Sequence, residues 1–397
     1  IVYFDVVNGN PGALDPQINA RIFRKSDNIP LMLVNIPYFE QKRVDYFQPD
    51  CSRGEVVTDR ILYTTIIELD GATFNDPGGY YIAWERCCRN YNIDNIKSDV
   101  PNVGPNYAGQ TFYLEFPPVV DENGDPFINS SPELFPPLND YACPYRPYWV
   151  DFAGTDIDGD SLVYSLVTPL NTQAACAIAT DPPCTIAQGG TPIGANPGPY
   201  PDVQWENGYG LDNILGGDPD LNISDDGFLT VTPKNEGLYV FAVLCEEYRD
   251  GKKIGEVRRD FQMLVVDKCP EADPPLIRGK KLTDTGYANT NKLTVNFPNT
   301  TTDQNRCVQV QVSDLDALKI GDNFSEEVFI SAVPLNFKGD VGVVLPENIR
   351  ATLLNGSKET FEICFPECPF IDPIESDYFE LAIVAFDDAC ALPLTDS

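Results

Sequence analysis

Three aspartates with alternating spacing are the residues best suited to chemistry in this sequence. They lie in the segment Asp156-Ile157-Asp158-Gly159-Asp160, where Gly159 allows a sharp turn of the backbone. A hard cation such as Ca²⁺ binds roughly six to eight oxygen atoms, and alternating carboxylates in a turn can supply several of them. Carboxylates this close repel one another unless something compensates their charge. Asp156, Asp158 and Asp160 are therefore predicted to be calcium ligands, and the alternative is a solvated acidic turn without an ion.

The residues after this turn predict the strand that positions it. Leu162, Tyr164 and Leu166 fall on one face of an extended chain, which is the period of a half-buried strand. A carboxylate turn that leads into a strand is typical of the end of a β-sandwich, and Glu247 or Glu246 on a neighbouring strand is expected to add a ligand. No helical pattern flanks the turn and no glutamate occupies the last loop position, so the segment is not an EF-hand.

A second turn repeats this spacing of oxygen ligands around a glycine. Asp121, Asn123 and Asp125 alternate, and Gly124 stands between the last two. The same argument predicts a second calcium site here, and a plain turn is the alternative.

Aromatic residues in a long insert suggest a different kind of site. Residues 171–220 are dense in Gly, Pro, Asn and Asp, and a connection of this length usually carries a function or wraps a surface. Tyr200, Trp205 and Tyr209 lie within it, and aromatic faces at intervals can stack on sugar rings. The alternative is that these side chains pack the insert onto the sandwich. Arg86 and Arg89 are likewise either a clamp for a glycan or carboxylate, or partners of nearby Asp and Glu.

The charge of the chain limits its partners. The 397 residues include 60 acidic and 27 basic side chains, which gives a formal net charge of −33. A phosphate backbone requires a basic surface, so nucleic acid is excluded as a partner, and insertion into a membrane is not expected. The charge suits a surface exposed to salt or divalent cations, which screen self-repulsion.

The chain contains no histidine. This excludes the Ser-His-Asp and Cys-His nucleophile systems and histidine zinc sites. A pair of carboxylates could still act as in glycosidases, but no acidic residue is distinguished from the other 59. We therefore expect no enzyme activity and no catalytic residues.

The 12 cysteines predict disulfides and an oxidising location outside the cytoplasm. They form no CxxC pair, which argues against zinc ribbons and thioredoxin-type redox motifs. Suppose that all 12 pair, and that Cys307, Cys364, Cys368 and Cys390 pair among themselves. Residues 1–119 then hold three cysteines and residues 141–269 hold five, so a bridge must join these two regions. The simplest choice is a bridge between Cys143 and either Cys87 or Cys88. Cys364 and Cys368 are expected to form a local disulfide. The disulfide candidates are Cys51, Cys87, Cys88, Cys143, Cys176, Cys184, Cys245, Cys269, Cys307, Cys364, Cys368 and Cys390.

Short runs of β-branched and aromatic residues between turn residues predict an all-β chain of tandem immunoglobulin- or cadherin-like β-sandwiches. The expected sandwiches are residues 1–119, 141–269 and 270–397, with a linker at 120–140. The third is expected to lack its last strand. We expect the chain to be part of a longer protein, since it begins within a strand-like run and shows neither a signal peptide nor a membrane-spanning apolar run. The main expected strands are 31–36, 60–69, 79–84, 111–116, 149–152, 161–166, 227–233, 237–245, 258–267, 292–297, 307–312, 327–333, 360–364 and 378–386.

Three strings in the same order resemble a known group of proteins. They are residues 84–90 (WERCCRN), 156–166 (DIDGDSLVYSL) and 247–262 (EYRDGKKIGEVRRDFQ). Their combination resembles the amino-terminal region of large Bacteroidota surface proteins that end in a gliding-motility-associated sorting domain and often carry PKD or cadherin-like repeats. The similarity covers about residues 40–270 clearly and the last unit loosely.

The resemblance implies export by the type nine secretion system, attachment at the cell surface, and a role in adhesion or gliding. Together with the residues above, it predicts a segment of an extracellular adhesin or filament, stiffened by Ca²⁺ and disulfides. The expected partners are other domains of the same long chain, with surface glycans or further copies of the chain as candidates. The alternative function is a carbohydrate-binding module that uses the aromatic insert around Trp205.

Overall fold

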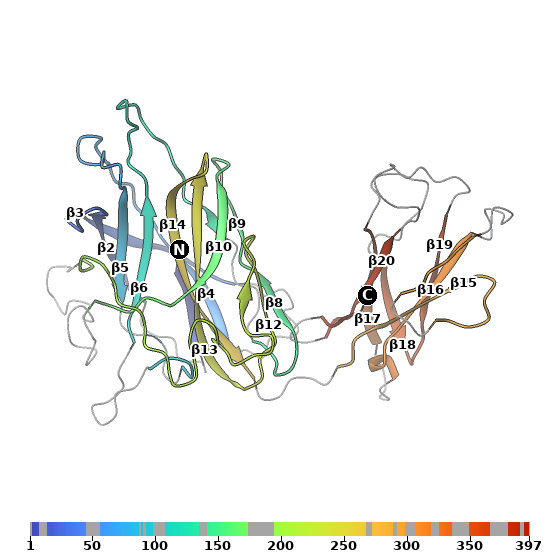
Figure 1. The fold of residues 1–397 in the computed structure, drawn as a ribbon. Coiled ribbons are helices and arrows are strands. Elements are labelled where there is room, and N and C mark those ends of the chain that lie inside the picture. The colour runs from blue at the N-terminus through green and yellow to red at the C-terminus, as the bar shows by residue number, and fades with distance from the viewer. Residues whose placement is uncertain are drawn as a thin grey trace, which may run out of the picture. The chain divides into compact units, whose positions relative to one another are not determined.

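The computed structural model describes the chain in two compact units, residues 1–269 and residues 270–397, which are considered separately below. Its strands are drawn in Figure 1. In the part of the chain that the structure describes there is no α-helix, and the expected all-β class is confirmed. None of the described helical segments is long and apolar enough to cross a membrane. The described residues are 2–7, 14–44, 56–86, 89, 93–97, 108–134, 141–173, 194–266, 272–288, 292–297, 306–318, 325–335, 349–365, 380–389 and 393–396.

A nine-stranded antiparallel sheet forms the body of the first unit. Strand β13 (Gly237–Arg249), next to one edge of this sheet, is buried without interruption from Leu238 to Val243, and its residues there are continuously apolar rather than alternating. In sheet order the strands are β1 (Val2–Val7), β4 (Val56–Tyr63), β3 (Pro30–Arg43), β2 (Gln17–Arg24), β5 (Tyr80–Arg86), β6 (Gln110–Phe116), β14 (Lys252–Val265), β13 (Gly237–Arg249) and β10 (Ser161–Val167).

The longest hairpin of this sheet joins β13 to β14 through Asp250 and Gly251. Their φ angles are +52° and +73°, the left-handed region that a tight primed turn requires at both positions. Asp-Gly is a preferred pair for this turn, which accounts for the tight connection between the two strands.

Two smaller sheets complete the first unit. One contains β11 (Asn222–Ile223), β12 (Phe228–Val231) and β8 (Tyr148–Asp151), and the other contains β7 (Glu133–Leu134) and β9 (Gly154–Thr155). Phe152, directly after β8, packs edge-on against Phe261 and Phe241 of the large sheet, with ring centroids 4.3 and 5.7 Å apart. This contact packs the segment after β8 onto β13 and β14.

The two sandwiches expected at 1–119 and 141–269 are not separate in the structure. β6 pairs with β14, with Glu115 opposite Glu256 and Leu114 opposite Val257, so one sheet runs through both regions. A strand edge that would be exposed in an isolated domain is paired with another strand instead. The expected linker at 120–140 is described as far as Leu134, and it contributes a β-bridge at Val120 and strand β7 to this same unit. Only the expected boundary at residue 270 matches the division into units.

The second unit is a β-sandwich. One sheet contains β15 (Leu276–Lys281), β16 (Cys307–Ser313) and β19 (Glu359–Cys364), and the other contains β18 (Ile349–Leu354), β17 (Ser325–Pro334), β20 (Leu381–Phe386) and β21 (Thr395–Asp396). A 3₁₀ turn, η3 (Asp316–Leu318), follows β16. Residues 292–297, expected as a strand, form none.

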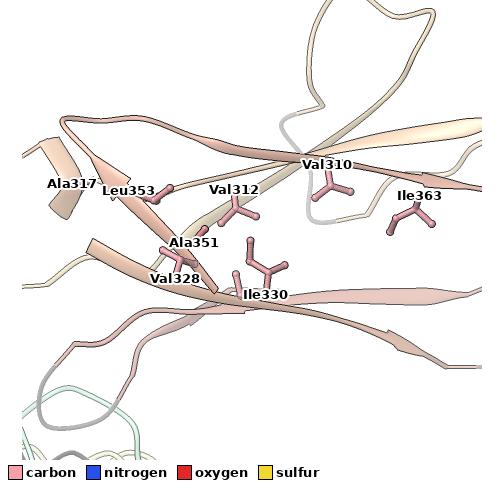
Figure 2. Packing of buried hydrophobic residues seen from close by; sticks show 9 residues of the cluster. Val310, Val312, Ala317, Val328, Ile330, Ala351, Leu353 and Ile363 are labelled. Carbon is pink, nitrogen blue, oxygen red and sulfur yellow. The ribbon is translucent and has the colours of Figure 1, made fainter. Parts of the chain in front are cut away.

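The core of this sandwich is built from alternate residues of the facing strands. Val310 and Val312 point from β16 toward Val328 and Ile330 of β17, and all four are at most 3% exposed (Figure 2). Because strand residues two apart share a face, this alternation in the sequence is what places them together.

The described cysteines differ from the pairing expected from sequence. Cys307 on β16 forms a disulfide with Cys364, the residue directly opposite on β19, so Cys364 does not pair locally with Cys368. Cys143 is also disulfide-bonded. Cys245, a disulfide candidate, is a free thiol buried in the middle of β13. Cys245 is therefore not a disulfide partner, and the condition that all 12 cysteines pair is not met. The other candidates, Cys51, Cys87, Cys88, Cys176, Cys184, Cys269, Cys368 and Cys390, lie outside the described residues.

Arg86 and Arg89 both contact carboxylates of the chain itself. Arg86 pairs with Asp15 at 2.8 Å, and the buried Arg89 pairs with Asp260 of β14. Arg89 also donates through Nε to the carbonyl of Gly109 and through Nη2 to that of Leu170, both at 2.9 Å. Arg89 therefore connects three separate segments of the first unit beneath its surface.

Replacing Arg89 by Ala is expected to destabilise the first unit by about 3–5 kcal/mol, because the carboxylate of Asp260 would remain buried without its charge partner. The measurement is urea unfolding followed by circular dichroism. The control is Arg24→Ala, which removes an exposed pair with Asp27 and should change the midpoint little. Equal midpoints for the two variants would contradict this role of Arg89.

Candidate metal centre

The turn before β10 is organised by the side chain of Asp156. Its Oδ1 accepts hydrogen bonds from the backbone amides of Asp158 at 2.9 Å and Asp160 at 3.1 Å. Gly159 has a φ of +83°, which is why a glycine is required at this position of the turn. Since Oδ1 is used within the turn, the other oxygen of Asp156 is left to bind elsewhere.

Strand pairing brings a third carboxylate to this turn. β10 runs antiparallel to β13, with Leu162 opposite Glu247. As a result, one oxygen each of Asp156, Asp160 and Glu247 lie within 4.8 Å of one another. The predicted contribution of Glu247 from a neighbouring strand thus agrees with its position.

These residues fit a hard cation. Oδ2 of Asp156 is buried and has no hydrogen-bond partner, and Glu247 is only 2% exposed. A buried carboxylate oxygen without a partner is costly, and a bound cation would remove this cost. Three oxygen donors, with water completing the shell, suit Ca²⁺, whereas softer metals prefer nitrogen or sulfur.

Asp158 is not one of the three clustered residues. Its Oδ2 accepts a hydrogen bond from the amide of Ser130 at 2.6 Å and lies 3.6 Å from Nη2 of Arg249. The carboxylate of Asp158 is thus used to hold the segment at Ser130, and the structure does not place this predicted ligand with Asp156 and Asp160.

Two residues that the sequence analysis missed surround the cluster. Arg249 holds both oxygens of Asp160 with Nε and Nη2, at 2.7 and 2.6 Å. Asn129 donates from Nδ2 to Oε1 of Glu247 at 2.8 Å. Arg249 lies two residues beyond Glu247 on β13, and this spacing from a predicted ligand could have indicated it from the sequence. Asn129 stood in the expected linker, and nothing in the sequence pointed to it.

The electrostatics of the cluster follow from these contacts. Burial is the main cause that raises the pKa of Glu247 to about 7, and the nearby charges of Asp156 and Asp160 add to it. The hydrogen bond from Arg249 is the main cause that lowers the pKa of Asp160. Arg249 compensates Asp160, but it forms no ion pair with Asp156 or Glu247.

The second predicted calcium turn has the same local structure without the cluster. Oδ1 of Asp121 accepts the amides of Asn123 at 2.8 Å and Asp125 at 2.9 Å, and Gly124 has a φ of +86°. All of these residues are exposed. No carboxylate from another strand joins this turn among the metal-ligand groups of the described residues.

The insert aromatics lie against the sheet. The ring of Tyr200 is 6.4 Å from that of Tyr81 on β5, and the ring of Tyr209 is 6.1 Å from that of Tyr239 on β13. Trp205 packs on an apolar cluster that includes Val240 and forms a β-bridge with Ile96.

A buried glutamate holds the two described ends of the insert. Glu85 accepts hydrogen bonds from the amide of Gln173 at 2.6 Å and from the amide of Asn196 at 2.7 Å. These contacts attach Gln173 and Asn196 to β5.

The chain matches no protein-family model and no curated protein. Among solved structures it is similar to domains A168-A170 from titin, with 8% sequence identity and a TM-score of 0.15, over 96% of this chain and 85% of that chain. A TM-score of this size carries no argument, so the fold class stated above rests on the strands themselves.

Replacing Glu247 by Gln is expected to remove the calcium-dependent stabilisation of the first unit. A ligand that binds only the native state stabilises it by about 2.7 kcal/mol at a concentration 100 times its Kd. The measurement is thermal unfolding with added Ca²⁺ and with chelator. Hydrogen exchange under the same two conditions shows which unit is stabilised. Asp125→Asn, in the matching exposed turn, is the control and should keep the full calcium response. A calcium response that Glu247→Gln leaves intact would exclude this cluster as the site.

Proposed function

We propose that the chain is a segment of a large extracellular surface protein, in which β-sheet units stiffened by Ca²⁺ and disulfides serve a structural and adhesive role. The observation that carries this proposal is the cluster of Asp156, Asp160 and Glu247 with its buried, unpartnered oxygen. Its position within the first unit would allow a bound ion to resist the separation of neighbouring strands.

The cluster lies where several segments of the first unit meet. Arg249 donates to the carbonyl of Ile128 at 3.0 Å and to Oδ1 of Asn129 at 2.8 Å, and its guanidinium lies 5.0 Å from the ring centroid of Phe127. These residues belong to the connection that leaves β6 and leads toward β8. A calcium ion held by Asp156, Asp160 and Glu247 would fasten the turn before β10 to β13, beside this connection.

Charge and crosslinks support the same role. A formal charge of −33 makes the folded chain repel itself, and bound divalent cations reduce that repulsion. The disulfide between Cys307 and Cys364 supports an oxidising compartment. The resemblance to Bacteroidota surface proteins adds export by type nine secretion and a role in adhesion or gliding. Other domains of the same long chain, surface glycans and further copies of the chain are the proposed partners. No catalytic role is proposed.

Pulling single molecules of the whole chain from its ends tests the mechanical role. The first unit is expected to unfold at a higher force in Ca²⁺ than in chelator, because the bound ion must be released before β10 separates from β13. In the Glu247→Gln variant, the first unit should unfold in both conditions at the force that the unaltered chain shows in chelator. Equal forces for the unaltered chain with and without Ca²⁺ would contradict the proposal.

A pocket beside Tyr200 favours sugar binding as a second candidate function. It has a volume of about 350 Å³, and it combines the aromatic side chains of Tyr81, Tyr113 and Tyr200 with polar groups that include Glu256 and Arg258. Aromatic faces beside charged groups are the usual means of holding a sugar ring in place. Trp205 does not line this pocket, so the proposed sugar site is centred on Tyr200 instead.

Replacing Tyr200 by Ala is expected to weaken binding to any glycan that the unaltered chain retains on an array by at least about tenfold, equivalent to about 1.4 kcal/mol. Trp205→Phe, outside the pocket, is the control and should bind as the unaltered chain does. An array on which the unaltered chain retains no glycan would remove this candidate.

A further inference from the structure

A second group of carboxylates lies at one end of the sandwich in the second unit. Asp314 follows β16, Glu326 stands at the start of β17, and Asp387 follows β20. One oxygen of each lies within 4.8 Å of the others. Asp387 is fully buried and Asp314 is 2% exposed.

Backbone amides use one oxygen of each buried aspartate and leave the other unpartnered. Oδ1 of Asp387 accepts the amides of Ala389 at 3.0 Å and Leu394 at 2.7 Å, and Oδ1 of Asp314 accepts that of Asp316 at 2.7 Å. The Oδ2 atoms of Asp314 and Asp387 are buried and have no hydrogen-bond partner. The lack of a partner for these two buried oxygens is independent of the clustering of acidic residues, and it indicates a ligand at this place.

Further carboxylates surround the group. Asp388 lies close enough to act electrostatically on Glu326, and Asp273 and Asp316 lie close enough to act on Asp314. Burial is the main cause that raises the pKa of Glu326 to about 9, and it raises the pKa values of Asp314 and Asp387 to about 6.

This group lacks the compensation found in the first unit. Within the part of the chain that the structure describes, no lysine or arginine forms an ion pair with Asp314, Glu326 or Asp387. In the first cluster, by contrast, Arg249 holds Asp160. A divalent cation is the partner that would satisfy several buried carboxylate oxygens at once.

We propose that Asp314, Glu326 and Asp387 bind a calcium ion in the second unit, with Asp388 and water completing its coordination. The donors are all oxygen, and the neighbouring carboxylates supply the number and the flexibility that Ca²⁺ prefers over the smaller, strictly octahedral Mg²⁺. This site is independent of the one in the first unit and of the mechanical role proposed for the chain.

The site would connect the two sheets of the sandwich. β16 belongs to one sheet, and β17 and β20 belong to the other. Oδ2 of Asp316, two residues beyond Asp314, accepts the amide of Asp273 at 2.7 Å, so the segment that leads into β15 is attached to the same place. The ion therefore crosslinks the sheets at the end where the chain enters the second unit.

Titration calorimetry with CaCl₂ on the chelator-treated 397-residue chain tests the proposal. We expect two equivalents of Ca²⁺ for the unaltered chain, and one for Asp387→Asn and for Glu326→Gln. Glu247→Gln should lose the other equivalent, and the two sites are thereby distinguished. MgCl₂ in place of CaCl₂ should give weaker binding. Unchanged stoichiometry in both second-unit variants would overturn the proposal.

Hydrogen exchange on the unaltered chain gives a second test that does not depend on whether a variant folds. Adding Ca²⁺ should slow exchange in peptides that cover residues 307–318, 325–335 and 380–389. Equal exchange in these peptides with Ca²⁺ and with chelator would overturn the proposal, even if the first unit responds to the ion.

Discussion

Carboxylates withdrawn from water and placed side by side are the constraint on which both units depend. Two like charges a few ångströms apart in a protein interior repel by several kcal/mol, and each also loses its hydration. The two units differ in how far this cost is offset. Arg249 compensates Asp160 in the first unit, while Asp314 and Asp387 in the second unit have no basic partner among the described residues. The second cluster therefore has the greater need for a bound cation.

Two turns of nearly the same sequence show how tertiary structure separates a candidate site from a plain turn. In both, an aspartate Oδ1 accepts the amides two and four residues later, and a glycine adopts a positive φ. The turn at Asp121 stays exposed, so water solvates its carboxylates. The turn at Asp156 lies against β13, which adds Glu247 and buries Oδ2 of Asp156. The difference between the turns lies in the neighbouring strand and not in their own residues.

The division of the chain shows a similar limit. Alternating apolar residues predicted most of the described strands, and the Asp250-Gly251 pair is of the type that a tight hairpin such as the one between β13 and β14 requires. The pairing of β6 with β14 joins the regions expected as two sandwiches, and it involves residues about 140 positions apart, such as Leu114 and Val257. Hydrogen bonding between strand edges is carried by the backbone, which leaves little trace in the side chains.

The sequence by itself determined the all-β class, the acidic turn that carries Asp156 and Asp160, and the acidic, histidine-free composition. These features follow from local spacing and composition, which act over a few residues. Only the tertiary structure decided that Asp158 turns away toward Ser130, that Cys364 pairs with Cys307, and that Asp314, Glu326 and Asp387 meet. Each of these depends on which strands become neighbours, and that is set by packing of the whole unit, not by any single stretch of the chain.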